Sequence, residues 1–119
     1  MPVPSACTER TGQNWRRAHG LLAEFSTAVR NAVDLIVIVC NDGGYGAEYV
    51  QFLNKGLDPG LSMFAWPEFA PLATALGGVG LTVRNEADLE KAAALIAQRK
   101  RPILIDLKLD PDQIPGVTL

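Results

Sequence analysis

A glycine-rich turn with one acidic residue follows the most apolar segment of the chain. The turn is Asn-Asp-Gly-Gly-Tyr-Gly, residues 41–46, and the apolar segment before it covers residues 35–39. Backbone amides exposed in such a turn, at the start of a helix, can bind phosphate. The Asp42 carboxylate and unpaired carbonyl oxygens can bind a hard divalent cation. The turn therefore predicts a site for a phosphate group and a metal ion.

A strand and a helix must hold this turn in place. The β-branched run 35–39 predicts a strand covered on both faces, and residues 47–54 predict a short helix with Val50 and Leu53 turned inward. Glycines between them allow positive φ angles. Because α/β folds bind ligands outside the carboxyl ends of their strands, the turn lies where a ligand is expected.

The remaining segments alternate between helical and strand patterns. Apolar spacing predicts a helix over 20–31, with a stripe formed by Leu21, Leu22, Phe25, Ala28 and Val29. Residues 55–66 predict a loop, and Pro67 opens a helix that Gly77 and Gly78 stop, with a stripe of Phe69, Leu72, Ala73 and Leu76. A strand is predicted over 79–83. Asn85 is expected to cap a helix that runs to about residue 98, with a buried stripe of Leu89, Ala92, Ala93 and Ile96.

A last strand is predicted over 103–109, after which residues 110–119 trail away. Helices alternating with short apolar strands imply parallel pairing through right-handed crossovers. We therefore expect an α/β fold, a three-layer domain with a mainly parallel sheet flanked by helices. Residues 1–18 lack any period and predict an irregular leader, so that the domain spans 19–119.

Composition excludes several classes of function. The chain has 119 residues, 48% hydrophobic and 20% charged, as in one small globular domain. A net charge of -2 argues against binding of nucleic acid. No apolar run is long enough to cross a membrane and no secretory signal is evident, so a cytoplasmic location is expected. Cys7 and Cys40 cannot form a zinc site by themselves, and Cys40 is expected in the core.

Other catalytic patterns are absent. His19 is the only histidine, and no nucleophile elbow accompanies it. The glycines of residues 43–46 match neither the dinucleotide fingerprint nor a Walker motif. Phe64, Trp66 and Phe69 are expected to serve the core or an interface. No residue of this chain is therefore predicted to be catalytic.

The order of motifs resembles the C-terminal domain of thiamine diphosphate-dependent enzymes. A helix and a strand lead to Asn-Asp-Gly-Gly-Tyr-Gly, then come a helix, Pro-Glu-Phe-x-x-Leu-Ala-x-Ala-Leu-Gly, another helix and Pro-Ile-Leu-Ile-Asp. The match covers about residues 20–112. It is similar to the branch that contains acetolactate synthase, benzoylformate decarboxylase and pyruvate decarboxylase. In that branch this domain binds the diphosphate of the cofactor and Mg²⁺.

The resemblance implies a set of site residues. Asp42 stands where the family places an asparagine ligand of the metal, and Gly44 stands where a carbonyl supplies another ligand. The cofactor-binding residues implied are Gly43, Tyr45, Gly46 and Ala47. Without the resemblance, the same residues are explained as a tight turn at the start of a helix.

Two family features are missing from this sequence. The metal motif normally begins with Gly-Asp-Gly, but Asn14-Trp15-Arg16 stands at that spacing, so Mg²⁺ binding is expected to be weak or lost. The domain is therefore expected to be incomplete at its N-terminus, as in a truncated enzyme. The family also uses a separate pyrimidine-binding domain, usually of a neighbouring subunit, whose glutamate activates the cofactor. Glu24 is expected to be structural and not a replacement for that glutamate.

The function implied is the thiamine diphosphate-binding portion of a 2-oxo acid decarboxylase or carboligase, such as an acetolactate synthase-like enzyme. The isolated chain is expected to be inactive, to require a pyrimidine-binding domain or subunit, and to form a homo-oligomer. Two alternatives stay open. One is a noncatalytic interaction domain that completes the sheet or dimer of a partner, and the other is an inactive remnant of such an enzyme.

Overall fold

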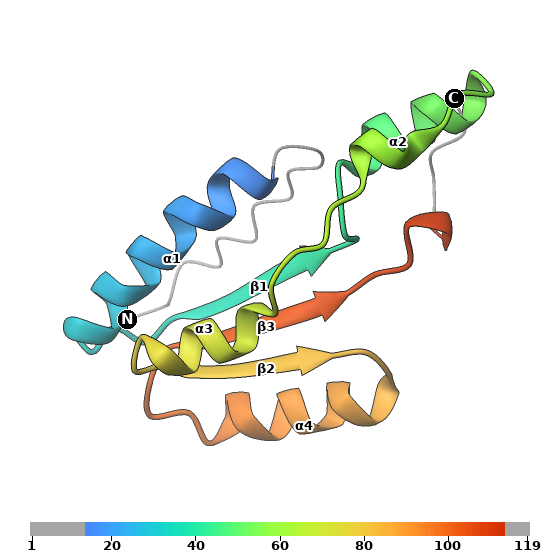
Figure 1. Ribbon diagram of the computed structural model, residues 1–119. Helices are drawn as coiled ribbons and strands as arrows, with labels where there is room; N and C mark the ends of the chain where they lie inside the picture. Colours follow the sequence, from blue (N-terminus) through green and yellow to red (C-terminus); the bar gives the residue numbers. More distant parts are fainter. Residues whose placement is uncertain (1–13, 114–119) are drawn as a thin grey trace, which may run out of the picture.

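The computed structural model describes residues 14–113, and the side chains of residues 21–113. The elements follow one another as α1 (Asn14–Arg30), β1 (Ile36–Asn41), α2 (Gly46–Asn54), the 3₁₀ turn η1 (Pro59–Ser62), α3 (Phe69–Ala75), β2 (Val79–Val83), α4 (Glu86–Ala97), β3 (Ile103–Lys108) and the 3₁₀ turn η2 (Pro111–Gln113). The three strands form one parallel sheet in the order β1-β3-β2 (Figure 1). The predicted α/β fold with parallel pairing is therefore confirmed.

Strand β3 lies in the middle of the sheet and is covered on both faces. Leu104 contributes to a cluster with Phe25 of α1 and Phe69 and Ala73 of α3. Ile103 and Ile105 point to the opposite face, into a cluster with Val83 and Ala92. Because neighbouring side chains of a strand point to opposite faces, β3 belongs to both cores. The helices thus form one layer of α1 and α3 and another of α4, with the sheet between them (Figure 1).

Helix α1 buries the predicted stripe. Phe25 is fully buried and Ala28 nearly so, while Leu22 and Val29 pack against the same cluster. The helix begins at Asn14, so residues 14–18 are helical, where the sequence pattern predicted an irregular leader. Residues 1–13, which include Cys7, lie outside the described residues.

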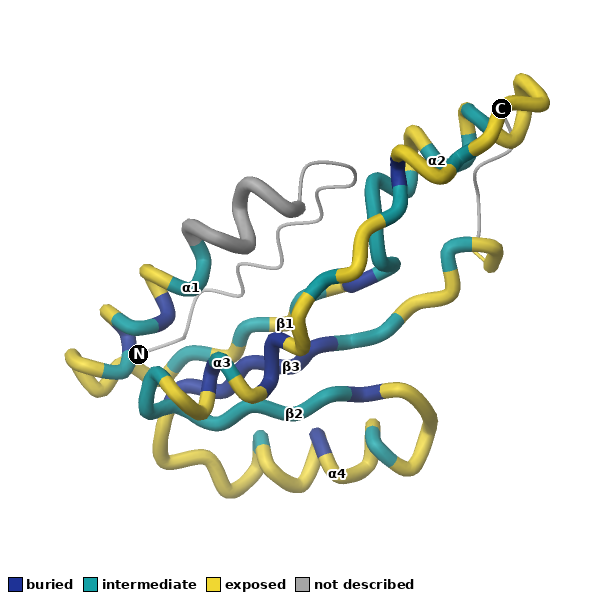
Figure 2. The backbone as a smooth tube through the Cα atoms, in the orientation of Figure 1, coloured by how far each residue is buried: buried dark blue, intermediate teal, exposed yellow. Residues whose placement is uncertain are grey.

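The expectation that both faces of β1 are covered was wrong. Burial alternates along β1 (Figure 2). Ile36 and Ile38 remain 37% and 56% exposed. Cys40, expected in the core, is exposed for the same reason. The cluster beneath α4 contains side chains of α4, β2 and β3 alone. Because β1 lies at the edge of the sheet, α4 does not reach it, and the face of β1 on the side of α4 stays uncovered.

The inward positions predicted for α2 and α4 were also wrong in part. None of the residues of α2 is buried, and Leu53 is 48% exposed, because α2 packs on η1 beyond the end of the sheet (Figure 1). On α4, Ala92 is buried but Leu89 and Ala93 are exposed. The periodicity located the helices correctly, but three strands are too few to cover every apolar face.

The ends of the helices around β2 follow the predicted chemistry. Asn85 accepts a hydrogen bond from the amide of Asp88 at 2.9 Å and so caps α4. After α3, Gly77 adopts a φ of +92°, which favours glycine. Gly80 on β2 has no room for a side chain, since a Cβ there would lie 1.9 Å from the carbonyl oxygen of Ala70. The absence of a side chain at residue 80 lets α3 approach the sheet.

Among the described residues, no helix is both long and apolar enough to cross a membrane.

Candidate functional site

The carboxyl edge of the sheet holds an open pocket of about 330 Å³. All three strands lead into it, and residues between η1 and α3 form another wall. Its lining is Asn41, Asp42, Gly43, Phe64, Ala65, Trp66, Arg84, Lys108 and Leu109. The pocket therefore lies where parallel sheets bind ligands, and it includes Asp42 and Gly43 from the predicted site.

A buried carboxylate fixes the base of this pocket. Asp106 is fully buried and accepts hydrogen bonds from the Asn41 side-chain amide at 3.0 Å and from the backbone amide of Phe69 at 3.3 Å. The Lys108 ammonium forms an ion pair with it at 2.9 Å. These partners offset the desolvation penalty that a buried, unpaired carboxylate would carry. Asp106 thus joins β1, β3 and the start of α3 at the edge where the pocket opens.

The amides of the glycine turn are already engaged within the chain. The Gly43 amide donates to the Asn41 side chain at 3.1 Å, and the Gly44 amide donates to Asp42 at 3.2 Å. The Tyr45 amide donates to the carbonyl of Ser62 at 2.8 Å. These bonds hold the turn against η1, and they leave those three amides unavailable to a diphosphate unless the turn rearranges.

Another part of the turn keeps its capacity to bind an anion. Tyr45 occupies the N-cap of α2 without a side-chain cap, so the first amides of α2, beginning at Gly46 and Ala47, have no intrahelical acceptor. The helix dipole favours an anion there, although Glu48 in the same turn opposes it. The predicted contribution of Gly46 and Ala47 to cofactor binding stays a prediction, with a local geometry compatible with it.

The residues present do not form a magnesium site on their own. Among residues 21–113, no three His, Cys, Asp or Glu side chains gather closely enough to hold a metal ion. Asp42 is the one carboxylate in the lining, and two cationic side chains, Arg84 and Lys108, share the pocket with it. A magnesium ion near Asp42 and the Gly44 carbonyl would need further oxygen ligands from a bound phosphate and water.

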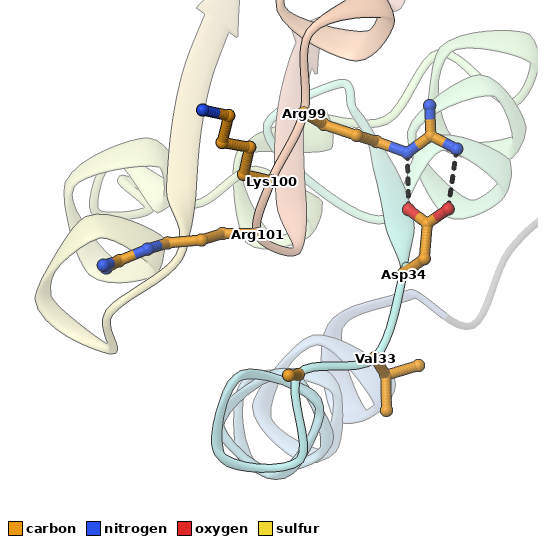
Figure 3. A pocket seen from close by; sticks show the side chains of 6 residues that line it. Val33, Asp34, Arg99, Lys100 and Arg101 are labelled. Carbon is orange, nitrogen blue, oxygen red and sulfur yellow. Dashed lines mark hydrogen bonds and ion pairs between the residues drawn. The ribbon is translucent and has the colours of Figure 1, made fainter.

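A second, smaller hollow of about 110 Å³ lies at the opposite end of the sheet. Arg99 forms a two-pronged ion pair with Asp34, with one N–O distance of 2.9 Å, while Lys100 and Arg101 point away from it (Figure 3). The hydrogen bonds from Arg99 lower the pKa of Asp34 below its ordinary value of 3.8. This pair joins the segment before β1 to the segment after α4, which is a structural role.

Replacing Asp34 by asparagine should reduce the loss in the free energy of unfolding that occurs when the pH falls from 7 to 3. Because its pKa is lowered in the folded state, Asp34 stabilises the fold fully above its unfolded pKa, and this contribution is lost as pH falls below about 4. Urea unfolding of both proteins at pH 7 and pH 3 measures the effect, which should be small since the pair is solvent-exposed. An equal acid dependence in the two proteins would show that the pair contributes nothing.

Sequence reasoning did not anticipate the cations that line the pocket, Arg84 and Lys108, or the carboxylates that pair with them, Glu68 and Asp106. One signal was present, since Asp106 interrupts the apolar run of the last strand, where a charge is costly unless it has partners. Arg84 directly follows β2, at the same edge of the sheet as Asp42. Aromatic side chains also contribute, because Phe64 and Trp66 line the pocket with ring centroids 5.2 Å apart.

Comparison with known families gives one result that bears on this site. The model of the C-terminal TPP binding domain of thiamine pyrophosphate enzymes matches residues 18–107. The matched region includes the glycine turn, Asp106, strands β1 and β2, and β3 up to Leu107. No curated protein matches the chain.

Proposed function

Because the chain belongs to the family of C-terminal TPP binding domains of thiamine pyrophosphate enzymes, we propose that it holds the diphosphate end of the cofactor in a 2-oxo acid decarboxylase or carboligase. An acetolactate synthase-like enzyme is one example, since the motif order resembles the branch that contains acetolactate synthase, benzoylformate decarboxylase and pyruvate decarboxylase. The observation that carries the proposal is the position of Asp42 and Gly43, which line a pocket at the carboxyl edge of the sheet. When bound, the cofactor supplies the carbanion chemistry that decarboxylates 2-oxo acids.

In this proposal the described residues bind and orient the diphosphate end of the cofactor, and another domain completes the site. Asp42 and the Gly44 carbonyl would supply oxygen ligands to the metal that accompanies the diphosphate, and the first amides of α2 would donate to the phosphate. The aminopyrimidine ring is held by a pyrimidine-binding domain or subunit, and the assembly is a homo-oligomer. We expect residues 1–119 by themselves to be inactive, because in the family the activating glutamate belongs to the pyrimidine-binding domain.

Binding of thiamine diphosphate by the isolated chain tests the proposal. Calorimetric titration in the presence of Mg²⁺ should give weak binding, and Asp42→Ala should reduce the affinity by about tenfold or more, because a charged ligand group is lost. Absence of binding to the wild-type chain at millimolar cofactor would contradict the proposal.

A matched variant separates the ligand role of Asp42 from its role in the turn. The Asp42 carboxylate also accepts a hydrogen bond from the Gly44 amide, so removal of the Asp42 side chain can loosen the turn. Asp42→Asn keeps a side-chain oxygen at the position where the family has asparagine, and it should retain most of the affinity. If Asn and Ala weaken binding equally, the charge rather than the oxygen geometry is responsible.

The exposed face of β1 favours a second candidate function, a noncatalytic interaction domain. Ile36 and Ile38 are partly exposed on an edge strand, and Cys40 beside them is exposed as well. Edge strands with apolar, uncharged side chains readily pair with another strand. In this alternative, thermal stability increases with protein concentration because assembly stabilises the fold, and thiamine diphosphate has no effect.

A further inference from the structure

Two cations in the pocket are bound to a carboxylate that does not line it. Arg84 follows β2, Lys108 ends β3, and both line the pocket at the carboxyl edge. Glu68, just before α3, lies 2.9 Å from Arg84 and 3.5 Å from Lys108. Its carboxylate also accepts a hydrogen bond from Thr82 at 3.4 Å. One carboxylate from the chain therefore bridges the two cations.

This bridge is easily opened. The side chains of Arg84 and Glu68 are 57% and 47% exposed, and ion pairs at such positions stabilise a fold only slightly. Lys108 is held differently, because its stronger partner is the fully buried Asp106 at 2.9 Å. If Glu68 moves into solvent, Lys108 remains anchored and Arg84 remains on the rim of the pocket.

We propose that Arg84 and Lys108 form a subsite for the carboxylate or phosphate group of a small ligand, and that Glu68 pairs with both cations, and so competes for them, when the ligand is absent. Arginine presents a planar fork that matches such oxyanions, and lysine adds a point charge. Phe64 and Trp66 supply an apolar wall beside the cations for the body of the ligand. In the absence of a metal ion, the Asp42 carboxylate, also in the lining, disfavours an anion on its own side of the pocket, which leaves the side of Arg84 the more favourable one.

The proposal does not depend on thiamine diphosphate, so the test omits both cofactor and metal. Trp66 lines the pocket, and its fluorescence can be followed alone in a Trp15→Phe background. Titration with pyrophosphate and, separately, with pyruvate, in the presence of a chelator, should give saturable changes for at least one anion. The more effective anion identifies the group that the subsite prefers. Affinity should fall with added salt, because the attraction is electrostatic.

Variants of the bridging carboxylate provide the decisive comparison. Glu68→Gln removes the competing charge and should tighten binding of the anion by about three- to tenfold. Glu90→Gln changes net charge equally at an exposed position of α4 outside the pocket lining, and it should leave affinity unchanged. Arg84→Gln should abolish binding while the fold is retained, as followed by circular dichroism.

Two results would overturn the proposal. One is the absence of any saturable change with either anion, in both the Trp15→Phe protein and its Glu68→Gln derivative. The other is an equal gain in affinity from Glu68→Gln and Glu90→Gln, which would indicate a general charge effect without a site. Metal-dependent binding of thiamine diphosphate would remain open in both cases, so the proposed cofactor role is judged separately.

Discussion

Replacing Asp106 by alanine should lower the free energy of unfolding by about 3–5 kcal/mol. The substitution removes the acceptor for the Asn41 side chain and for the Phe69 amide, and it removes the main partner of Lys108. Unsatisfied donors at buried positions are costly, and three elements lose their common contact at once. Urea unfolding followed by circular dichroism measures the loss, which will leave a domain of this size only marginally folded or unfolded.

A double-mutant cycle shows whether the charge itself is required. Asp106→Leu together with Lys108→Met replaces the pair by apolar side chains, and it should recover part of the stability that Asp106→Leu alone removes, because no unpaired ammonium remains. If Asp106→Ala costs less than about 1 kcal/mol, the hydrogen bonds at Asp106 do not organise the edge of the sheet as described.

Replacing Phe25 by alanine should cost about 3–5 kcal/mol, the typical loss for a large aromatic side chain in a core. Phe25 is fully buried and contacts the cluster that joins α1 to α3 and β3. The aromatic ring also lies under Gly78, where an added Cβ would come within 2.5 Å of it. Helix α1 should therefore separate from the sheet, which hydrogen exchange of the amides in residues 21–30 will detect as a loss of protection.

Glu24→Ala provides the matched control for Phe25→Ala on the same helix. Glu24 is exposed, so its removal should change the free energy of unfolding by no more than about 0.5 kcal/mol. A large effect of Glu24→Ala, or equal effects of the two variants, would mean that α1 contributes to stability by a surface other than the one described.

The two candidate anion sites both lie at the carboxyl edge of the sheet. The turn of residues 41–46 approaches the pocket from the end of β1, while Arg84 and Lys108 approach it from β2 and β3. Before a ligand binds, Glu68 pairs with Arg84 and Lys108. Hydrogen bonds within the chain already engage the amides of residues 43–45.

Local sequence patterns were enough to predict the order of elements, the parallel sheet, most of the buried stripe of α1 and the family. These features depend on short-range patterns: a helix repeats every 3.6 residues, a cap such as Asn85 acts on an amide three residues away, and the crossover rule follows from alternating helices and strands. The glycine turn was recognisable for the same reason, since its residue types and its position after an apolar run are local properties.

Local patterns could not predict which faces of the elements stay exposed or which polar groups already have hydrogen-bond partners within the fold. Ile38 of β1 resembles Ile105 of β3 in sequence context, yet one is exposed and the other buried, because α4 reaches the middle of the sheet and not its edge. Asn41 and Asp106 bond across 65 residues, and the Tyr45 amide finds its acceptor on Ser62. Burial and hydrogen-bond satisfaction depend on neighbours that folding brings from distant parts of the chain, and no local pattern specifies them.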